Sequence, residues 1–445
     1  MNSANGHASA TCRYVMQCEK EPAWDDGDLT VSHGFLPRRI RTRALPPQYE
    51  AWEQTARDLP ALSFSPTTRK TIASIPLLPS DPVSLPDRDL KRAAMLLGML
   101  AHSYWRFGVD RMFVPRNKDI PDELPEAIRR PWDEVCRRLG RSGPGLTIED
   151  WVFNNFTFLD AGHVGADGDY DVANISNETV RPLVPAYGSE VERVFTSSFI
   201  DIHAAITPVV GSACRIADAI HQEGPDGCEQ VARELEEIAR CARAAKTAFS
   251  RVSPSRKSRT YCDPVDWAKT LVTWTVPPPG YPPGPSGSAT PLNHFMDAVI
   301  GRTDYSTTQG AFAKSLRGTQ LSRKHEHFCD LVKAVGIRAY ITGLRATGGN
   351  RFSTTAAAFD HVIESFAGAN GFLGVHKGKV IDYLGVGTVV GRNQSTAHDQ
   401  THIQDSSWTA MADGLADAIT ERETRRVGQA LSGSCAPSVP SAVVR

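Results

Sequence analysis

One apolar stretch near the C-terminal end of the chain, residues 371–384, has the spacing of a helix and carries one histidine. Phe372, His376, Val380 and Tyr383 fall on one face of such a helix, because residues three or four positions apart share a face. A histidine on a buried helix face needs a partner for each ring nitrogen. Two interpretations stay open: a core histidine bonded to a backbone carbonyl, or a single axial ligand of a haem iron.

Helical spacing of apolar residues recurs along most of the chain. It covers residues 90–107, 191–211 and 214–250, and a last amphipathic segment carries Trp408 and Ile419. No region shows a convincing run of strand patterns. The proline-rich residues 277–288 must form a loop, because proline fixes φ and removes a backbone donor. We therefore predict an all-α fold.

Changes in composition along the chain suggest five segments. Residues 1–30 mix polar residues without a period, as a flexible tail does, and residues 161–190 are polar and glycine-rich, as a linker is. The predicted segments are a flexible tail (1–30), a small helical domain (31–160), a linker (161–190), a large helical domain (191–430) and a disordered C-terminal tail (431–445).

The charge balance and the cysteines exclude several classes of protein. The chain has 49 basic and 50 acidic residues, which argues against a general nucleic-acid or membrane-surface binder. It has no run of 18 apolar residues that predicts a membrane span, and its beginning lacks the pattern of a signal peptide. The 9 cysteines are scattered without a metal-site or Cys-x-x-Cys spacing. We expect free thiols in a reducing, cytoplasmic setting.

The motifs around His376 resemble the proximal-histidine helix of the indoleamine 2,3-dioxygenase family. In both, an aliphatic residue and a tyrosine follow the histidine, and a Gly/Thr-rich turn, here residues 387–396, comes next. The N-terminal half has a similar order of Leu-Pro, Pro131-Trp132 and a helix ending at Gly140. The resemblance spans about residues 33–430. It implies a two-domain helical fold with a haem pocket in the larger domain.

The resemblance also implies a function and a set of site residues. The family is haem b-dependent and inserts dioxygen into the indole 2,3 bond of tryptophan, so a small aromatic substrate and dioxygen are the expected partners. Haem would be held by His376, its iron ligand, with Ser286 and Gly287 beside it. Ser197 falls where a family serine faces the bound oxygen. The substrate-binding residues implied in the same way are Trp151, Val152, Trp267, Arg392, Ser395 and Thr396.

Two positions depart from the family pattern. Val272 stands where the family usually has an arginine that pairs with the substrate carboxylate, and Leu373 stands where an arginine often lies near the haem propionates. Arg392 is the best replacement as an anion partner. These departures are similar to what is expected of the pyrrolnitrin-pathway branch, which rearranges a chlorinated tryptophan. The alternatives are therefore a specialised enzyme of the same fold, carrying out ring rearrangement or hydroxylation, and a non-enzymatic haem-binding or sensor protein.

Overall fold

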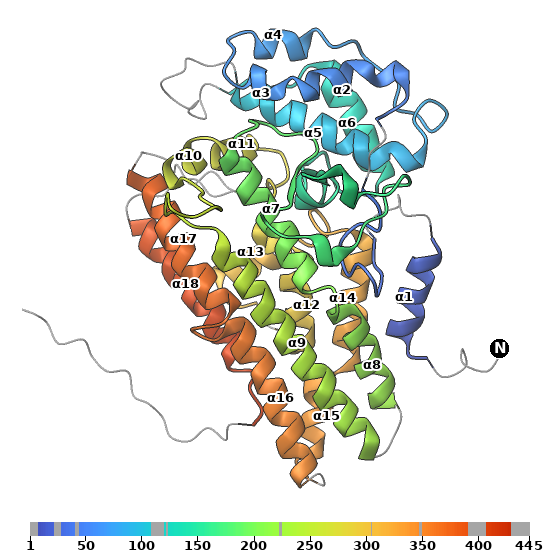
Figure 1. The fold of residues 1–445 in the computed structure, drawn as a ribbon, viewed down its shortest axis with the longest axis vertical. Helices are drawn as coiled ribbons and strands as arrows, with labels where there is room; N and C mark the ends of the chain where they lie inside the picture. The colour runs from blue at the N-terminus through green and yellow to red at the C-terminus, as the bar shows by residue number, and fades with distance from the viewer. Residues whose placement is uncertain are drawn as a thin grey trace, which may run out of the picture.

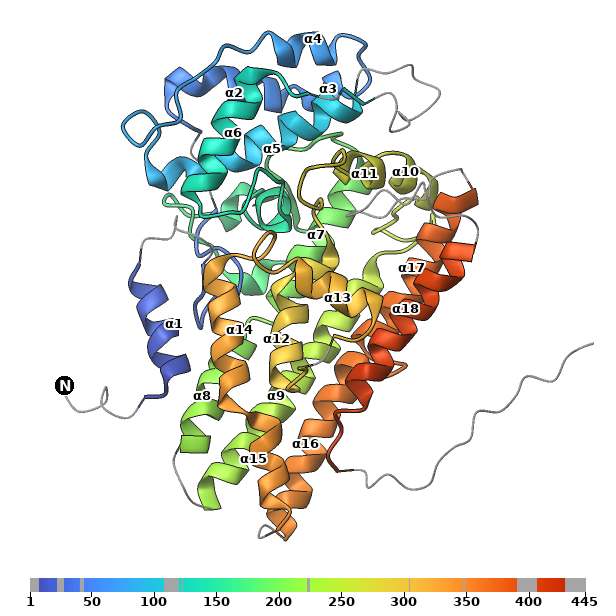
Figure 2. The same ribbon diagram turned by 180° about the vertical axis from the view of Figure 1, so that it is seen from behind.

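The computed structural model confirms an all-α fold, in which helices are joined by irregular segments (Figures 1 and 2). It describes residues 8–21, 28–40, 44–107, 120–121, 123–221, 225–303, 305–346, 349–389 and 406–428. The predicted site residues Arg392, Ser395 and Thr396 lie outside these ranges. The strands in the described part form one antiparallel pair, β1 (Phe156–Phe158) and β2 (Val180–Pro182), with Thr157 opposite Arg181.

A small group of helices lies at one end of the molecule (Figure 1). It comprises α2 (Glu50–Arg57), α3 (Leu59–Leu62), α4 (Thr68–Ala73), α5 (Leu90–Arg106) and α6 (Glu126–Arg138). Helix α5 is buried on nearly all sides between α2, α4 and α6, which explains its long apolar run. Short 3-10 turns and one π-helical turn complete the irregular segments: η1 (Pro47–Tyr49), η2 (Asp87–Asp89), η4 (π-helical, Glu149–Phe153), η5 (Ala161–His163), η6 (Val172–Asn174) and η7 (Gly287–Ala289).

The larger group of helices forms the rest of the molecule (Figure 2). Helices α7 (Glu190–Ala205), α8 (Val209–His221), α9 (Pro225–Arg251) and α16 (Asn350–Ala367) pack side by side around a second apolar core. The remaining helices are α10 (Pro264–Lys269), α11 (Leu271–Thr275), α12 (Pro291–Val299), α13 (Thr308–Ser315), α14 (Arg323–Val335), α15 (Ile337–Leu344), α17 (Phe372–Val389) and α18 (Ser406–Glu423).

The structure differs from the sequence-based segments in three places. Residues 10–20, expected in a flexible tail, form helix α1 (Ala10–Lys20), which buries Val15 and Cys18 against α8 and α14. Residues 161–190, expected as a linker, are packed, with Val180 and Val184 in the first apolar core. The helix expected over 191–211 divides into α7 and α8 just before and after Pro208, whose ring nitrogen cannot donate a helical hydrogen bond.

Helices α7 and α8 together form a long apolar stretch inside the molecule. The segment Glu190–His221 is long and apolar enough to cross a membrane, but 72% of its most apolar window is buried within the protein. The core helix of a soluble protein has these same properties, because it needs apolar side chains on most of its surface. The hydropathy of this segment is therefore accounted for by packing against α9.

A buried ionic cluster joins the small group of helices to α14. Glu149 lies 2.8 Å from His325 Nδ1 and 3.8 Å from Lys91 Nζ, and it accepts a hydrogen bond from the Ser322 N–H at 3.1 Å. His325 Nε2 lies 2.7 Å from the Asp28 carbonyl oxygen. Both ring nitrogens of His325 thus face oxygen atoms of the protein.

We expect the Glu149 cluster to make the stability of the protein sensitive to acid. Burial opposes ionisation of Glu149, but His325, Lys91 and the Ser322 N–H outweigh it and lower the pKa of the carboxyl from 4.5 to about 2. Because this pKa is lower in the folded protein, ionised Glu149 stabilises folding above pH 4.5, and the stabilisation is lost as the pH falls through 2. The contribution amounts to about 3 kcal/mol.

Urea denaturation of the wild type and of Glu149→Gln between pH 2 and 7 measures this contribution. The difference in free energy of unfolding between the two proteins should shrink as the pH falls below 4.5, the ordinary pKa of the carboxyl. A difference that stays constant over the whole range would contradict the assignment.

Candidate functional site

The larger helical group forms a partly open cavity of about 1060 Å³. Helices α7, α12, α13, α17 and α18 line it, together with the end of α9 and residues 286–290. Aromatic side chains form much of its wall, namely Phe195, Phe199, Phe249, Trp267, Phe312, Phe372 and Tyr383. A space of this size with flat aromatic walls can take a large planar ligand together with a small one.

His376 borders this cavity from the second turn of α17. Its ring packs against Phe249, with ring centroids 5.4 Å apart, and against Phe372 at 6.4 Å. Burial alone lowers the pKa of His376 to about 4, so the imidazole is neutral at neutral pH. None of the hydrogen bonds among the described residues involves its ring. A neutral imidazole without such a partner keeps a lone pair for a metal ion.

Helix α7 forms a second wall of the cavity. Phe195, Ser198, Phe199 and Ile202 line it at helical spacing. The structure does not bring Ser197 to the cavity: the Ser197 hydroxyl donates to the Val180 carbonyl at 2.8 Å. Successive helical residues are rotated by about 100°, so the neighbouring serine takes the cavity-lining position.

His203 also borders the cavity, one turn further along α7. Its Nδ1 lies 2.8 Å from the Phe199 carbonyl oxygen, so Nδ1 carries the proton and donates. Burial is the largest influence on this ring and lowers its pKa to about 4. Nε2 is therefore an acceptor, and it is buried without a hydrogen-bond partner.

The other predicted residues divide between the cavity wall and a layer behind it. Trp267 lines the cavity, with its ring 5.5 Å from the Tyr383 ring, and Ser286 and Gly287 line it from the loop before α12. Trp151 and Val152 are buried in η4 and do not line the cavity. The Trp151 ring lies 6.1 Å from that of Phe195, so it supports a wall residue from behind.

The two departures from the family pattern fall in different places. Val272 is buried in α11 and does not line the cavity, whereas Leu373 borders it from the first turn of α17. The cations that do line the cavity are Arg302, Lys377, Lys379 and Arg422.

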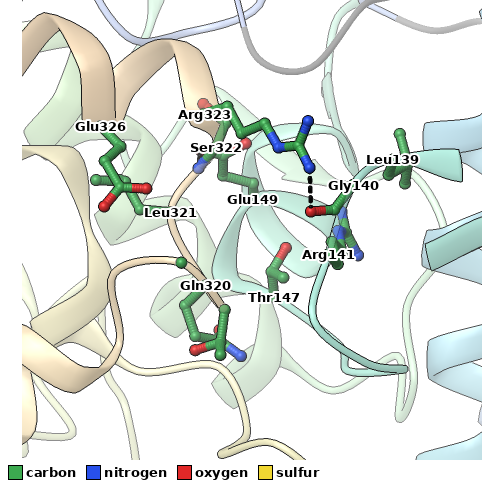
Figure 3. Close-up of a pocket in the computed structure, with 12 residues that line it drawn as sticks. Leu139, Gly140, Arg141, Thr147, Glu149, Gln320, Leu321, Ser322, Arg323 and Glu326 are labelled. Carbon is green, nitrogen blue, oxygen red and sulfur yellow. Dashed lines mark hydrogen bonds between the residues drawn. The ribbon is translucent and has the colours of Figure 1, made fainter. Parts of the chain in front are cut away.

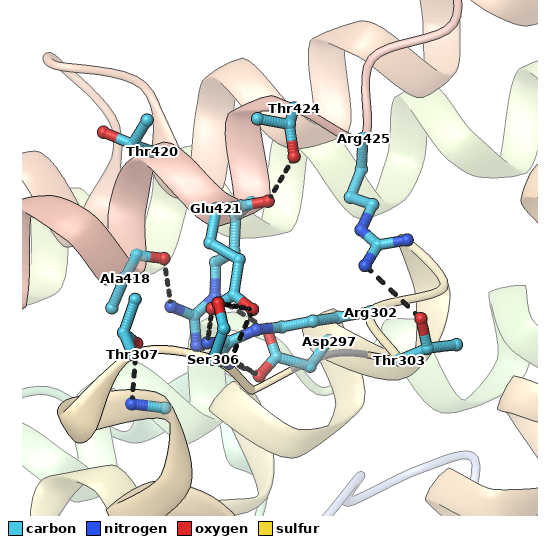
Figure 4. A network of polar contacts seen from close by, with 12 residues as sticks. Asp297, Arg302, Thr303, Ser306, Thr307, Ala418, Thr420, Glu421, Thr424 and Arg425 are labelled. Atoms are coloured by element: carbon cyan, nitrogen blue, oxygen red, sulfur yellow. Dashed lines mark hydrogen bonds and ion pairs between the residues drawn. The ribbon is translucent and has the colours of Figure 1, made fainter.

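A charge network joins α12 to α18, and the sequence pattern did not identify it (Figure 4). Asp297 on α12 accepts from Arg302 at 2.9 Å and from Arg422 on α18 at 2.7 and 3.0 Å. Arg302 also pairs with Glu421. The partners lie up to 125 residues apart, so no local motif joins them. The network attaches α18 to α12 beside the cavity.

A smaller pocket of about 190 Å³ lies between residues 139–149 and 318–326 (Figure 3). Its charged side chains are already engaged. Arg141 pairs with Asp150 at 2.6 Å, Arg323 donates to the Gly140 carbonyl at 2.7 Å, and Glu149 belongs to the cluster described above. This pocket is a polar junction between the two groups of helices, and the large cavity is the candidate functional site.

The residues around the large cavity fit a haem group. Among the described residues, no three His, Cys, Asp or Glu side chains gather in a way that could hold a metal ion by themselves. One neutral, unpartnered imidazole instead suits an iron whose other ligands come from a macrocycle. The aromatic walls supply flat apolar surface for such a ring. The cavity therefore has the features that a haem pocket needs, with His376 as the residue that would hold the iron.

Comparison with known proteins gives the family. The sequence model of indoleamine 2,3-dioxygenase matches residues 24–275, more than half of the chain. The protein belongs to the indoleamine 2,3-dioxygenase family. The match includes α7 and Trp267, and it ends before Ser286, Gly287 and His376.

Similar curated proteins carry the same name. Indoleamine 2,3-dioxygenase of Saccharomyces cerevisiae is 35% identical over 152 residues, 33% of this chain and 31% of that protein. Indoleamine 2,3-dioxygenase 1 of Mus musculus is 25% identical over 222 residues, 49% of this chain and 47% of its own length. The Rattus norvegicus protein of that name is 25% identical over 245 residues, 55% and 53% of the two chains. The matches thus span about a third to a half of these relatives.

Proposed function

We propose that the protein is a haem b-dependent oxygenase that acts on tryptophan or a related indole, with insertion of dioxygen into the indole 2,3 bond as its reaction. The observation that carries this proposal is the neutral imidazole of His376, which has no hydrogen-bond partner among the described residues, at the wall of a large aromatic cavity. Membership of the indoleamine 2,3-dioxygenase family supports it. We further propose that the enzyme is cytoplasmic and acts on small molecules rather than on nucleic acid or membranes.

Bound haem would supply the redox chemistry with dioxygen that amino-acid side chains lack. The protein's own part is to hold the iron through His376 and to position the substrate. Trp267, Phe195 and Phe199 offer flat apolar surfaces to an indole ring and exclude water around it. The polar groups on the α7 wall are the Ser198 hydroxyl, which donates to the Phe195 carbonyl at 2.6 Å, and the His203 ring.

The substrate contacts favour one alternative within the same fold. Because Val272 is a buried apolar residue away from the cavity, no guanidinium from this position can bind a substrate carboxylate. A bidentate arginine contact confers both energy and orientation on a carboxylate. The departure at the cavity wall itself is Leu373, an apolar residue where the family often has an arginine, and it supports a specialised enzyme that rearranges or hydroxylates a tryptophan-like aromatic amine.

An absorption titration tests the proposed function. The full-length protein, reconstituted with haemin and reduced, should show a Soret band that shifts with carbon monoxide. Adding L-tryptophan, or a substituted indole or aromatic amine, should perturb that band, and oxygenated turnover of tryptophan should yield N-formylkynurenine. Turnover of another aromatic amine without N-formylkynurenine would support the alternative enzyme. A Soret band without turnover of any of these compounds would indicate a haem-binding or sensor protein. Failure to bind haemin would overturn the oxygenase and the alternative haem enzyme alike.

A further inference from the structure

Lys379 lies one turn after His376 on α17 and reaches the C-terminal end of α9. Its Nζ donates to the Phe249 carbonyl at 2.8 Å, to the Ser250 carbonyl at 3.0 Å and to the Val252 carbonyl. The last carbonyls of a helix have no partner within the helix, and a cation there also complements the helix dipole. Lys379 therefore satisfies the end of α9 with three hydrogen bonds.

Phe249 connects Lys379 to His376. Its carbonyl accepts from Lys379, the Lys379 ammonium lies 4.9 Å from the centroid of its ring, and that ring lies 5.4 Å from the His376 ring at an angle of 33°. Lys379 thus contacts both the backbone and the ring of the residue that packs against the imidazole. Because no hydrogen bond among the described residues orients His376, packing must do so.

A second contact fixes the same face of α17 one turn further on. The Tyr383 hydroxyl donates to the Cys262 carbonyl at 2.9 Å, and its ring meets Trp267 edge to face at 5.5 Å. Lys379 and Tyr383 together hold the helix at two points on the side that carries His376. The rotation of α17 about its axis is set by these two contacts.

We propose that Lys379 is a positioning residue that sets the orientation of the His376 imidazole by holding Phe249 against it. The inference rests on the proposed function, in which His376 binds the haem iron. A packed aromatic ring on one face of an imidazole restricts its rotation, and the direction of the ring determines the direction of its metal bond. Lys379 acts on the iron site through Phe249 and does not touch the reacting atoms.

Lys333 provides a control lysine. It lies in the last turn of α14, exposed to solvent and outside the cavity lining, and it makes none of the carbonyl contacts of Lys379. Lys379→Met keeps the length and apolar stem of the side chain and removes its donors. Lys379→Arg keeps a positive charge and several N–H donors, so it should recover part of the wild-type behaviour.

The iron–histidine stretching band of the reduced, haemin-reconstituted protein is the first readout. Lys379→Met should shift or broaden this band and raise the haemin dissociation rate about tenfold, a change at the lower end of those seen when groups supporting a metal ligand are removed. Lys333→Met should leave both unchanged. Phe249→Leu, which keeps the carbonyl contacts but removes the ring, should reproduce the change in the band even if Lys379→Met does not fold.

A readout without haem separates this inference from the proposed function. In the haem-free protein, the NMR resonance of the His376 Cε1 proton should move in Lys379→Met and in Phe249→Leu, because the neighbouring ring current changes. The resonance should stay in place in Lys333→Met. If the wild type binds no haemin, the proposed function fails while this resonance still tests the role of Lys379. Wild-type band positions and wild-type resonances in both Lys379→Met and Phe249→Leu would overturn the inference.

Discussion

Replacing His376 with alanine should weaken haemin binding by more than about 100-fold, since loss of a ligand exceeds the effect of losing its supporting groups. The Soret band of the reduced protein should weaken or lose the features of histidine ligation. The free energy of unfolding of the haem-free protein should change by less than about 1 kcal/mol, because His376 has no hydrogen-bond partner in the part of the chain that the structure describes and faces a cavity. Haemin titration followed by absorbance, with urea denaturation in parallel, measures both quantities.

His361 is the matched control for this experiment. It lies on α16, exposed to solvent, and pairs with Glu236 at 2.6 Å. His361→Ala removes the same imidazole from a site outside the cavity, so haemin affinity should remain that of the wild type. Equal affinity for haemin in His376→Ala and the wild type would show that another residue holds the iron, and the pocket assignments would fail with it.

Replacing Asp297 with asparagine should lower the free energy of unfolding by about 3–5 kcal/mol, the range observed when one partner of a buried ion pair is removed. Asp297 is buried and bonds to both Arg302 and Arg422. The asparagine would leave two buried guanidinium groups with only Glu421 to balance them. Urea denaturation at neutral pH measures the change.

The same variant should also affect the cavity. Arg302 and Arg422 line it, and the network holds α18 against α12, so haemin should dissociate faster from Asp297→Asn than from the wild type. Asp330→Asn is the control, because Asp330 pairs with Arg317 at 2.7 Å on the surface of α14. An exposed pair contributes less than about 1 kcal/mol. Similar losses of stability in the two variants would contradict the structural role of the network.

The sequence predicted the helical elements best where an apolar pattern is long. The helix expected over residues 90–107 forms α5 at Leu90–Arg106, and the segment around His376 forms α17. Short or mixed patterns were less informative. Residues 10–20 carry few apolar side chains, and these fold into α1 only because α8 and α14 provide a surface for them. Helix formation there depends on contacts more than 190 residues away in sequence.

The family resemblance selected single residues on separate elements, and the structure places some of them at the cavity wall and others away from it. Trp267, Ser286, Gly287 and His376, which the family resemblance selected, line the cavity, and their roles in binding haem or substrate stay a prediction. Ser197 does not line the cavity, because an error of one position on a helix turns a side chain by about 100°. Trp151 and Val152 lie one layer behind the cavity wall. Only the three-dimensional position of Phe195, which the Trp151 ring contacts, shows that these two residues are separated from the cavity.

By itself the sequence determined that the chain is helical and that one histidine lies in an apolar stripe near its end, because periodicity is a local property. The tertiary structure alone decided what surrounds that histidine. Phe249, which packs on the imidazole, is 127 residues earlier in the chain, and Asp297 meets Arg422 across 125 residues. Such contacts arise from how whole helices pack together, and no local spacing of residues encodes them.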